Sequence, residues 1–343
     1  MLFKCLINEK YTDFARKNSR VTIFIYNNST LFYTSLYVRQ HAKPTRFDSA
    51  ESWVILSNIE QRIKAKIEAI GTPLKDWNIQ INYGIKTGFN DAFIINGEKR
   101  AELIAKDPKS AEIIRPILRG CDIKRYSYEF NDRYLICTFP SLKIDIEQYP
   151  AVKGFLEGFK AKLKQTGEIL SKSEINNIIG YAKNHNIDVK EKDLLTSRKK
   201  TKNKWFETQD SINYWEDFYK QVLAWQRITK ENQFCLTEKG MVILDSMAFI
   251  SGIEQYKYWL LALLNSRLIY AWVKWNVHEY GDTGFRLSNQ YVQEIPIVPL
   301  DKDLEKTIIT LLNEKQYHKI DTIIYKLYDL SDEEINFIKA LKK

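Results

Sequence analysis

The sequence predicts an α+β fold in which a mixed sheet is followed by a C-terminal helical tail. Short β-type runs alternate irregularly with helical stretches up to about residue 300, and amphipathic helical patterns follow one another after it. The chain has 343 residues, of which 44% are hydrophobic. It is therefore long enough to bury the core of one large or two modest domains without disulfides or metals.

The first 72 residues predict a hairpin and a long helix. Two β-type runs, at residues 21–26 and 31–37, flank a turn at 27–30. Asp48, with Glu51 three residues later, predicts the start of a helix that ends at Ile70. Because Gly and Pro follow it, we place a domain boundary at residue 72.

The middle of the chain predicts several short elements. We expect strands at residues 79–83, 92–95, 134–139, 221–228 and 241–250, and helices at residues 98–105, 111–118 and 149–164. Residues 166–213 are rich in Lys, Asn, Ser and Asp and lack apolar periodicity, which predicts loops with marginal helices.

The last third predicts a buried helix and then the helical tail. The helix begins near Gln255, and polar residues interrupt its apolar run at 258–275, which a membrane span would not tolerate. Residues 278–286 predict a loop, and the prolines within 295–299 predict an extended segment. Tail helices are expected at 304–312, at 320–327 and, from the capping box of Ser331 and Glu334, through Lys342.

Composition limits the partners of the protein. The formal net charge is +9, with 52 Lys and Arg residues against 43 Asp and Glu residues, which fits DNA, RNA or an anionic membrane. The N-terminal residues do not form a signal peptide, so we expect a cytoplasmic protein with no membrane partner. The cysteines are too scattered for a zinc site or a disulfide framework; they are Cys5, Cys121, Cys137 and Cys235.

The common catalytic motifs are absent from the sequence. We find no Asn/Asp-Pro-Pro-aromatic loop of an amino-methyltransferase, no glycine-rich nucleotide motif and no P-loop. The four histidines, His41, His185, His278 and His318, are far apart. We therefore predict no catalytic residue, no metal site and no cofactor in this chain. Asp107 with residues 122–124 matches a magnesium nuclease pattern loosely. Such a short pattern is common in a chain that is 28% charged, so it is weak support for a nuclease.

Four stretches in order resemble one known family. They are residues 84–95 (GIKTGFNDAFII), 113–126 (IIRPILRGCDIKRY), 260–267 (LLALLNSR) and 295–297 (IPI). Together they resemble the TaqI-like C-terminal specificity domain of Type IIG restriction enzymes and adenine-N6 DNA methyltransferases. The resemblance covers about Trp53 to Pro299, and residues 320–328 resemble the ends of such enzymes.

The resemblance implies three regions and a function. Residues 1–72 correspond to the end of a methyltransferase domain, residues 73–300 to a DNA target-recognition domain and residues 301–343 to the helical tail. The family implies sequence-specific recognition of double-stranded DNA, which directs adenine methylation, cleavage or both, with the adenine presented by base flipping. S-adenosylmethionine and Mg²⁺ are implied for the full enzyme, as is a methyltransferase or nuclease domain or subunit. The chain is then a truncated piece, a recognition subunit or a remnant.

Basic residues in these stretches are the candidate DNA contacts. Lysine and arginine neutralise phosphates, and arginine also reads guanine edges. We expect contacts from Lys86, Thr87, Arg119, Arg125, Arg198, Lys199, Lys200, Lys202, Lys204, Arg227 and Arg286. Each has a structural alternative, such as a tight turn at 84–88, an ion-pair corner at 119–125 or a solvated loop at 198–204.

Two further functions remain open from the sequence. In the first, the chain keeps a magnesium-dependent nuclease around Asp107 and Asp122. In the second, it is a stand-alone specificity subunit whose hairpin and tail helices dock on a separate methyltransferase chain.

Overall fold

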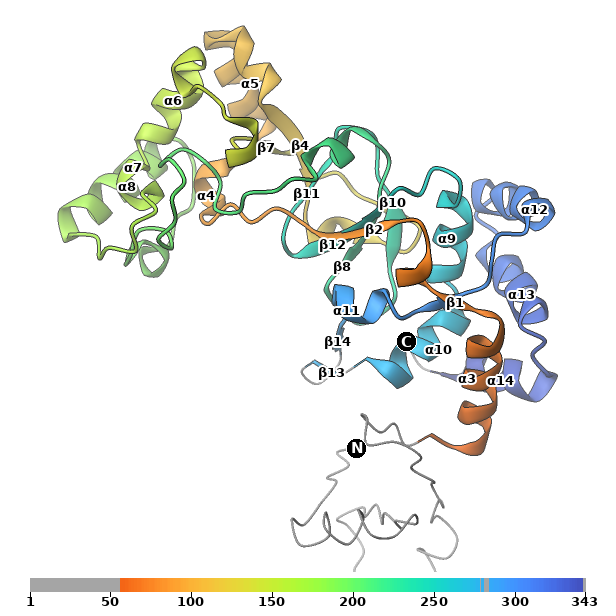
Figure 1. Cartoon of the computed structure of the whole chain (residues 1–343). Helices are drawn as coiled ribbons and strands as arrows, with labels where there is room; N and C mark the ends of the chain where they lie inside the picture. Colours follow the sequence, from red (N-terminus) through yellow and green to blue (C-terminus); the bar gives the residue numbers. More distant parts are fainter. Residues whose placement is uncertain (1–55, 278, 281–283, 342–343) are drawn as a thin grey trace, which may run out of the picture. The chain divides into compact units, whose positions relative to one another are not determined.

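The computed structural model describes residues 56–277, 279–280 and 284–341 (Figure 1). The chain divides into two compact units, residues 1–66 and 67–343. The hairpin predicted at 21–37 and the helix start predicted at Asp48 lie outside the described residues. Leu56 and Ser57 are not helical, and the described helix α3 begins at Asn58 and ends at Ile70 as predicted.

The described helices occur in three groups along the chain. They are α3 (Asn58–Ile70), α4 (Asn90–Phe93), α5 (Gly97–Lys106), α6 (Pro150–Glu157), α7 (Lys160–Leu163), α8 (Lys172–Asn184), α9 (Lys257–Leu264), α10 (Arg267–Asn276), α11 (Asn289–Val292), α12 (Lys302–Asn313), α13 (Tyr317–Leu327) and α14 (Asp332–Ala340). Short 3-10 turns are η2 (Leu74–Asp76), η3 (Pro108–Glu112), η4 (Gly120–Asp122), η5 (Pro140–Leu142), η6 (Ile146–Gln148), η7 (Glu191–Leu194) and η8 (Trp215–Tyr219).

The described strands are short. They are β1 (Thr72–Pro73), β2 (Gln80–Tyr83), β3 (Ile94–Asn96), β4 (Ile114–Leu118), β5 (Ile123–Lys124), β6 (Ser127–Tyr128), β7 (Arg133–Ile136), β8 (Leu223–Gln226), β9 (Ile228–Thr229), β10 (Phe234–Leu236), β11 (Val242–Ile243), β12 (Met247–Ser251), β13 (Glu279–Tyr280), β14 (Gly284–Arg286) and β15 (Pro296–Ile297).

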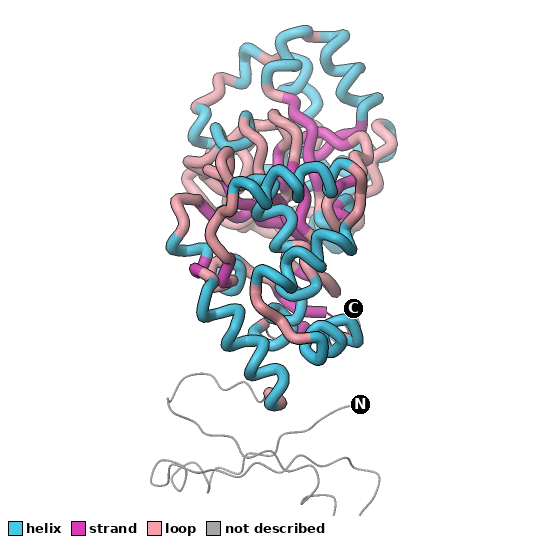
Figure 2. Tube along the Cα trace, turned by 90° about the vertical axis from the view of Figure 1, so that its right-hand side faces the viewer, coloured by secondary structure: helices cyan, strands magenta, loops and turns pink. Residues whose placement is uncertain are grey.

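Two four-stranded sheets form the centre of the second unit. One has the order β10-β8-β12-β2, and the other has the order β11-β4-β7-β3. In the second sheet β11 runs parallel to β4, while the remaining pairs are antiparallel. In Figure 2 the strands gather in the middle of this unit with helices around them. The predicted α+β fold with a mixed sheet and a helical tail is thus confirmed.

Residues 241–251 connect the two sheets. The sequence predicts one strand at 241–250, but the chain forms β11 in one sheet and β12 in the other. One hydrophobic core includes Ile117 of β4 and Phe249 of β12, neither of which is exposed. Burying such a side chain contributes about 1.5–3 kcal/mol, so both sheets depend on the same packing.

Residues 111–118 are not the predicted helix. They form η3 and β4, because Pro116 lacks the N–H that a helix interior needs. Pro116 lies opposite Tyr134 of β7, and pairing with β11 starts only at Ile117. The strand therefore accommodates its proline where the second neighbour is not yet paired.

The helix predicted at 149–164 is interrupted. It forms α6 and α7, and the ring of Tyr181 fills the space in which a side chain at Gly158 would lie. Residues 92–95 are likewise divided between α4 and β3.

Residues 166–213 contain a regular helix that the sequence did not predict. Helix α8 has 13 residues, and Ser171 and Glu174 form a capping box at its start. This capping signal was present in the sequence, and the buried Ile175, Ile178 and Ala182 that follow it have helical spacing. The prediction missed both signals because most residues of the surrounding segment are polar.

The apolar run after Gln255 forms two helices instead of one. Ser266 follows the end of α9 and accepts a hydrogen bond from the Ile269 N–H, which caps α10. Such a cap is worth about 1 kcal/mol. Residues 279–280 and 284–286 form strands within the segment predicted as a loop. The tail helices and the Ser331 capping box are confirmed.

Candidate nucleic-acid interface

The turn at residues 84–88 separates an exposed lysine from a buried threonine. Thr87 Oγ1 donates to Asn90 Oδ1 at 2.6 Å and accepts from the Phe89 N–H at 3.1 Å. Thr87 is 1% exposed, so it stabilises the turn and does not offer the expected DNA contact. The side chain of Lys86 is exposed.

Close packing fixes this turn against the strand connection at residue 244. A Cβ atom on Gly84 would lie 2.0 Å from the carbonyl oxygen of Leu244. The Asp245 N–H donates to the Ile85 carbonyl at 2.9 Å. Lys86 therefore projects from a backbone that both sheets hold in place.

Arg198 holds the same turn from inside the protein. Its guanidinium donates to the carbonyl oxygens of Thr87, Leu163 and Trp205 at 2.7–3.0 Å, and the side chain is 2% exposed. Burial lowers the pKa of Arg198 to about 9, so the group stays charged at neutral pH. The structure thus gives Arg198 a structural position in place of the expected phosphate contact.

The lysines that follow Arg198 are all exposed. They are Lys199, Lys200, Lys202 and Lys204. The same segment continues to Gln209 and Asp210, whose N–H groups donate to the carbonyls of Thr87 and Lys86. The lysine run and the turn at 84–88 are therefore neighbours although more than a hundred residues separate them.

The basic residues of the corner at 119–125 are engaged within the protein. Arg119 binds the Asp122 carboxylate through Nη2 at 3.0 Å and Nε at 3.3 Å. Arg125 donates twice to the Asn265 carbonyl, and its Nη2 lies 3.7 Å from Asp321 Oδ2. Both arginines are partly exposed, but their main contacts are structural.

Arg227 lies beside a half-buried carboxylate. Its Nη1 donates to the Asp245 carbonyl at 2.8 Å, and its guanidinium carbon lies 4.6 Å from the centroid of the Tyr83 ring. Its Nε is buried and has no hydrogen-bond partner among the described residues. Burial raises the pKa of the Asp245 carboxyl, and the charges of Lys86 and Arg227 partly offset this effect.

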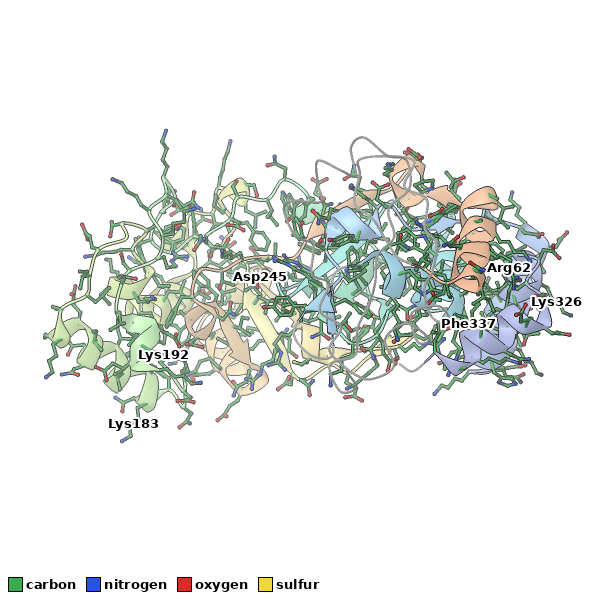
Figure 3. The ribbon with its side chains drawn as sticks, turned by 90° about the horizontal axis from the view of Figure 1, so that it is seen from below. Arg62, Lys183, Lys192, Asp245, Lys326 and Phe337 are labelled. Carbon is green, nitrogen blue, oxygen red and sulfur yellow. The ribbon has the colours of Figure 1, made fainter. Side chains whose placement is uncertain are left out.

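The charges of Lys86 and Arg227, two of the predicted DNA contacts, therefore both act on the Asp245 carboxyl. Figure 3 shows it between the part that carries Lys183 and Lys192 and the part that carries Lys326. Sequence reasoning missed Asp245 and Tyr83, because a single acidic residue between two strands and a tyrosine at a strand end carry no motif.

Arg286 lies on a small sheet that continues from Arg227. It is exposed and lies opposite Ile228, which follows Arg227 in the chain. Arg286, Ile228 and Tyr280 share one face of this sheet, since Tyr280 is opposite Gly284, two residues before Arg286. Ile228 and Tyr280 are 47% and 52% exposed.

The carboxylates of the nuclease-like pattern do not form a metal site. Asp122 accepts hydrogen bonds from Arg119 and Asn131, and Asp107 caps η3 through Lys109 N–H and Ser110. Burial favours a higher pKa for Asp122, but these hydrogen bonds outweigh it and lower the pKa. Within residues 56–277, 279–280 and 284–341, no three His, Cys, Asp or Glu side chains are grouped to hold a metal ion.

The described helices were compared with the length and hydropathy of a membrane span. In the part of the chain that the structure describes, none has both the length and the apolar character that a membrane span requires.

Comparison with known proteins gives one family match. The family model described as the TaqI-like C-terminal specificity domain matches residues 115–297, more than half of the chain. No curated protein matches the chain.

Two solved structures were also found to be similar. One is the Type IIL restriction-modification enzyme MmeI in complex with DNA, with a TM-score of 0.48 and 11% identity over 87% of this chain. The other is the type IIG restriction endonuclease BpuSI, with a TM-score of 0.44 and 14% identity over 75% of this chain. The chain spans 39% and 28% of those two chains.

Proposed function

Because the chain belongs to the TaqI-like C-terminal specificity domain family, we propose that it recognises a short sequence in double-stranded DNA. In this role it is the target-recognition module of a Type IIG-like restriction–modification enzyme. The family predicted from the four ordered stretches is confirmed by the match, although the matched range begins later than the predicted Trp53.

The grouping of exposed basic side chains carries this proposal. The segment that carries the exposed lysines 199–204 is hydrogen-bonded to the turn that carries Lys86, and the charges of Lys86 and the partly exposed Arg227 both act on Asp245. A duplex presents a regular array of phosphates, and each lysine that neutralises one adds affinity that falls as salt rises. The rigid turn beneath Lys86 supports a fixed register on the duplex.

Two arginines are the best candidates for reading bases. A guanidinium binds the O6 and N7 atoms of guanine through two parallel hydrogen bonds. Arg286 is exposed on β14, whereas Arg227 is partly buried against the Tyr83 ring and the Asp245 carbonyl, with its Nε shielded from solvent. We expect Arg286 to contact a base directly and Arg227 to contact the duplex beside it.

Catalysis is assigned to other domains or subunits. The motifs of a methyltransferase are absent from this sequence, and the described carboxylates do not form a metal site. We propose that a methyltransferase domain or chain supplies S-adenosylmethionine chemistry, that Mg²⁺ serves a nuclease part where one is present, and that an adenine is flipped toward the former. This function implies a cytoplasmic protein.

A binding selection tests the proposal. The chain is incubated with a pool of random duplex DNA at two salt concentrations, and the bound fraction is sequenced. An enriched motif with salt-sensitive affinity supports recognition. Binding without enrichment contradicts sequence reading, and a lack of binding favours a subunit that needs its methyltransferase partner.

A set of variants connects the binding to this surface. Replacing all four lysines of the run by alanine should reduce the slope of log K against log salt by about 0.9 for each phosphate that is no longer neutralised. Arg286→Ala should relax preference at one base position and cost about 1–3 kcal/mol. Lys326→Ala is the matched control, because Lys326 is exposed on α13, outside this surface (Figure 3).

A further inference from the structure

The carboxylate of Asp245 lies near two cationic side chains without forming an ion pair. Burial raises the pKa of this carboxyl, and the nearby charges of Lys86 and Arg227 lower it. In the described part of the chain neither cation is within ion-pair distance of it, and the Ser246 N–H, next in sequence, is the one hydrogen-bond donor that acts on it. Because a carboxylate has about four acceptor sites, the partly buried oxygens of Asp245 retain the capacity to accept further hydrogen bonds.

The surrounding backbone fixes the position of Asp245. It lies in the link between β11 and β12, where its N–H donates to the Ile85 carbonyl at 2.9 Å and its carbonyl accepts from Arg227 Nη1 at 2.8 Å. The Arg227 N–H donates to the Ser246 carbonyl at 3.1 Å, and the Gly120 N–H donates to Ser246 Oγ at 3.0 Å. Segments that follow β4 and β8 therefore hold this link, and a side chain on a fixed backbone can select one ligand geometry.

The surroundings of Asp245 are open to solvent. Lys86 and Ser246 are exposed, and Tyr83, whose ring lies against the Arg227 guanidinium, is 44% exposed. Asp210, whose charge also acts on Asp245, is exposed as well. The carboxylate is itself partly exposed, so a macromolecule bound at this surface can reach it.

A carboxylate at a DNA-binding surface favours one kind of chemical group. It repels phosphates, which carry the same charge, whereas Lys86 and Arg227 attract them. In the major groove cytosine N4 and adenine N6 carry amino groups that donate hydrogen bonds. Guanine and thymine present oxygen acceptors at the corresponding positions, and two acceptors placed against each other weaken binding.

We propose that Asp245 is a base-reading residue that accepts a hydrogen bond from the amino group of a cytosine or an adenine in the major groove. This inference rests on the proposed recognition of double-stranded DNA and deepens it by naming a side chain and the group that it reads. Lys86 and Arg227 hold the flanking phosphates, so the acidic group does not prevent the duplex from approaching.

Bases without the amino group test this contact one position at a time. In a duplex that carries the selected site, each cytosine in turn is replaced by 2-pyrimidinone, which lacks the amino group. Each adenine is replaced by 2-aminopurine, which carries its amino group in the minor groove. At one position the replacement should weaken binding by wild type about tenfold and binding by Asp245→Ala less than about twofold. The base at that position identifies the source of the amino group.

Two further variants separate base reading from other effects. Asp210→Ala is the matched control, because it also removes a negative charge that acts in these surroundings. It should keep the tenfold response of wild type, which accounts for any change in the duplex itself. Asp245→Asn has almost the same size as the native residue and keeps an uncharged acceptor, so its response should be intermediate. This variant also keeps the test valid if Asp245→Ala does not fold.

The outcomes distinguish the inference from the function on which it rests. If Asp245→Ala and Asp245→Asn respond as wild type does at every position, base reading by Asp245 is overturned and DNA recognition stands. If Asp210→Ala loses the response as well, the effect is one of charge alone, and base reading by Asp245 is again overturned. If wild type selects no DNA sequence, both the inference and the proposed function are overturned.

Discussion

Replacing Arg198 by alanine should destabilise the fold, whereas replacing its neighbour Lys199 should affect only DNA binding. Arg198 provides charged donors to three buried carbonyls, those of Thr87, Leu163 and Trp205. Leaving one buried polar group unpaired costs about 1–3 kcal/mol. With partial access of water to the vacated space, we expect a loss of about 4 kcal/mol, a large fraction of the roughly 5–15 kcal/mol that stabilises a typical protein.

Chemical denaturation and thermal melting measure this loss. At about 2–4 °C per kcal/mol, Arg198→Ala should lower Tm by roughly 10 °C. Lys199→Ala should leave the free energy of unfolding within about 0.5 kcal/mol of wild type. In DNA titrations Lys199→Ala should reduce the salt slope by about 0.9 if the lysine contacts a phosphate.

Arg198→Lys keeps the variant comparison informative if the alanine variant does not fold. Lysine retains the charge but cannot reach three carbonyls with one ammonium group, so stability should fall by an intermediate amount. An Arg198→Ala protein that melts like wild type and loses salt-dependent DNA affinity would refute the structural role of this arginine.

Three further predictions concern the residues around the interface. Gly84→Ala should cost more than about 2 kcal/mol in urea denaturation, because its Cβ would overlap the Leu244 carbonyl, whereas Gly154→Ala, with no atom within 4 Å, should stabilise α6 by about 0.5–1 kcal/mol. Asp122→Asn should lower stability by about 2–4 kcal/mol at pH 7. The pKa of Asp122 is lowered in the folded state from its usual value of 3.8. The stability that the ionised carboxylate contributes is therefore complete above that value and is lost as pH falls through the folded pKa. The unfolding curves of wild type and Asp122→Asn should converge only in strong acid. Arg125→Ala should cost about 1–3 kcal/mol in stability and leave the salt slope of DNA binding unchanged; a reduced slope with normal stability would assign Arg125 to the duplex instead.

The parts of the fold that the sequence predicted are those specified locally. Strand β2 and helices α5, α12 and α14 follow from periodicity and capping residues within a few positions of each element. The parts it did not predict depend on distant partners. Residues 241–250 contain two apolar runs separated by Asp245 and Ser246, but the sequence does not show that the runs join different sheets. That division arises from pairing with β4 on one side and with β2 and β8 on the other.

The candidate interface shows the same limit. The sequence shows that most of residues 198–204 are basic, but it does not show which of these side chains is buried. Arg198 is buried because Leu163 and Thr87, remote in sequence, present carbonyls to it.

The path of residues 241–251 through both sheets has a consequence for the order in which the protein opens. Since β11 and β12 are consecutive and belong to different sheets, neither sheet can separate without pulling on the other. Amide hydrogens of Ile117 and Phe249 should then exchange with solvent through a single global opening, at matching rates under conditions where exchange reports equilibrium. The exposed lysines at 199–204 belong to neither β11 nor β12, so replacing their side chains need not alter this global opening.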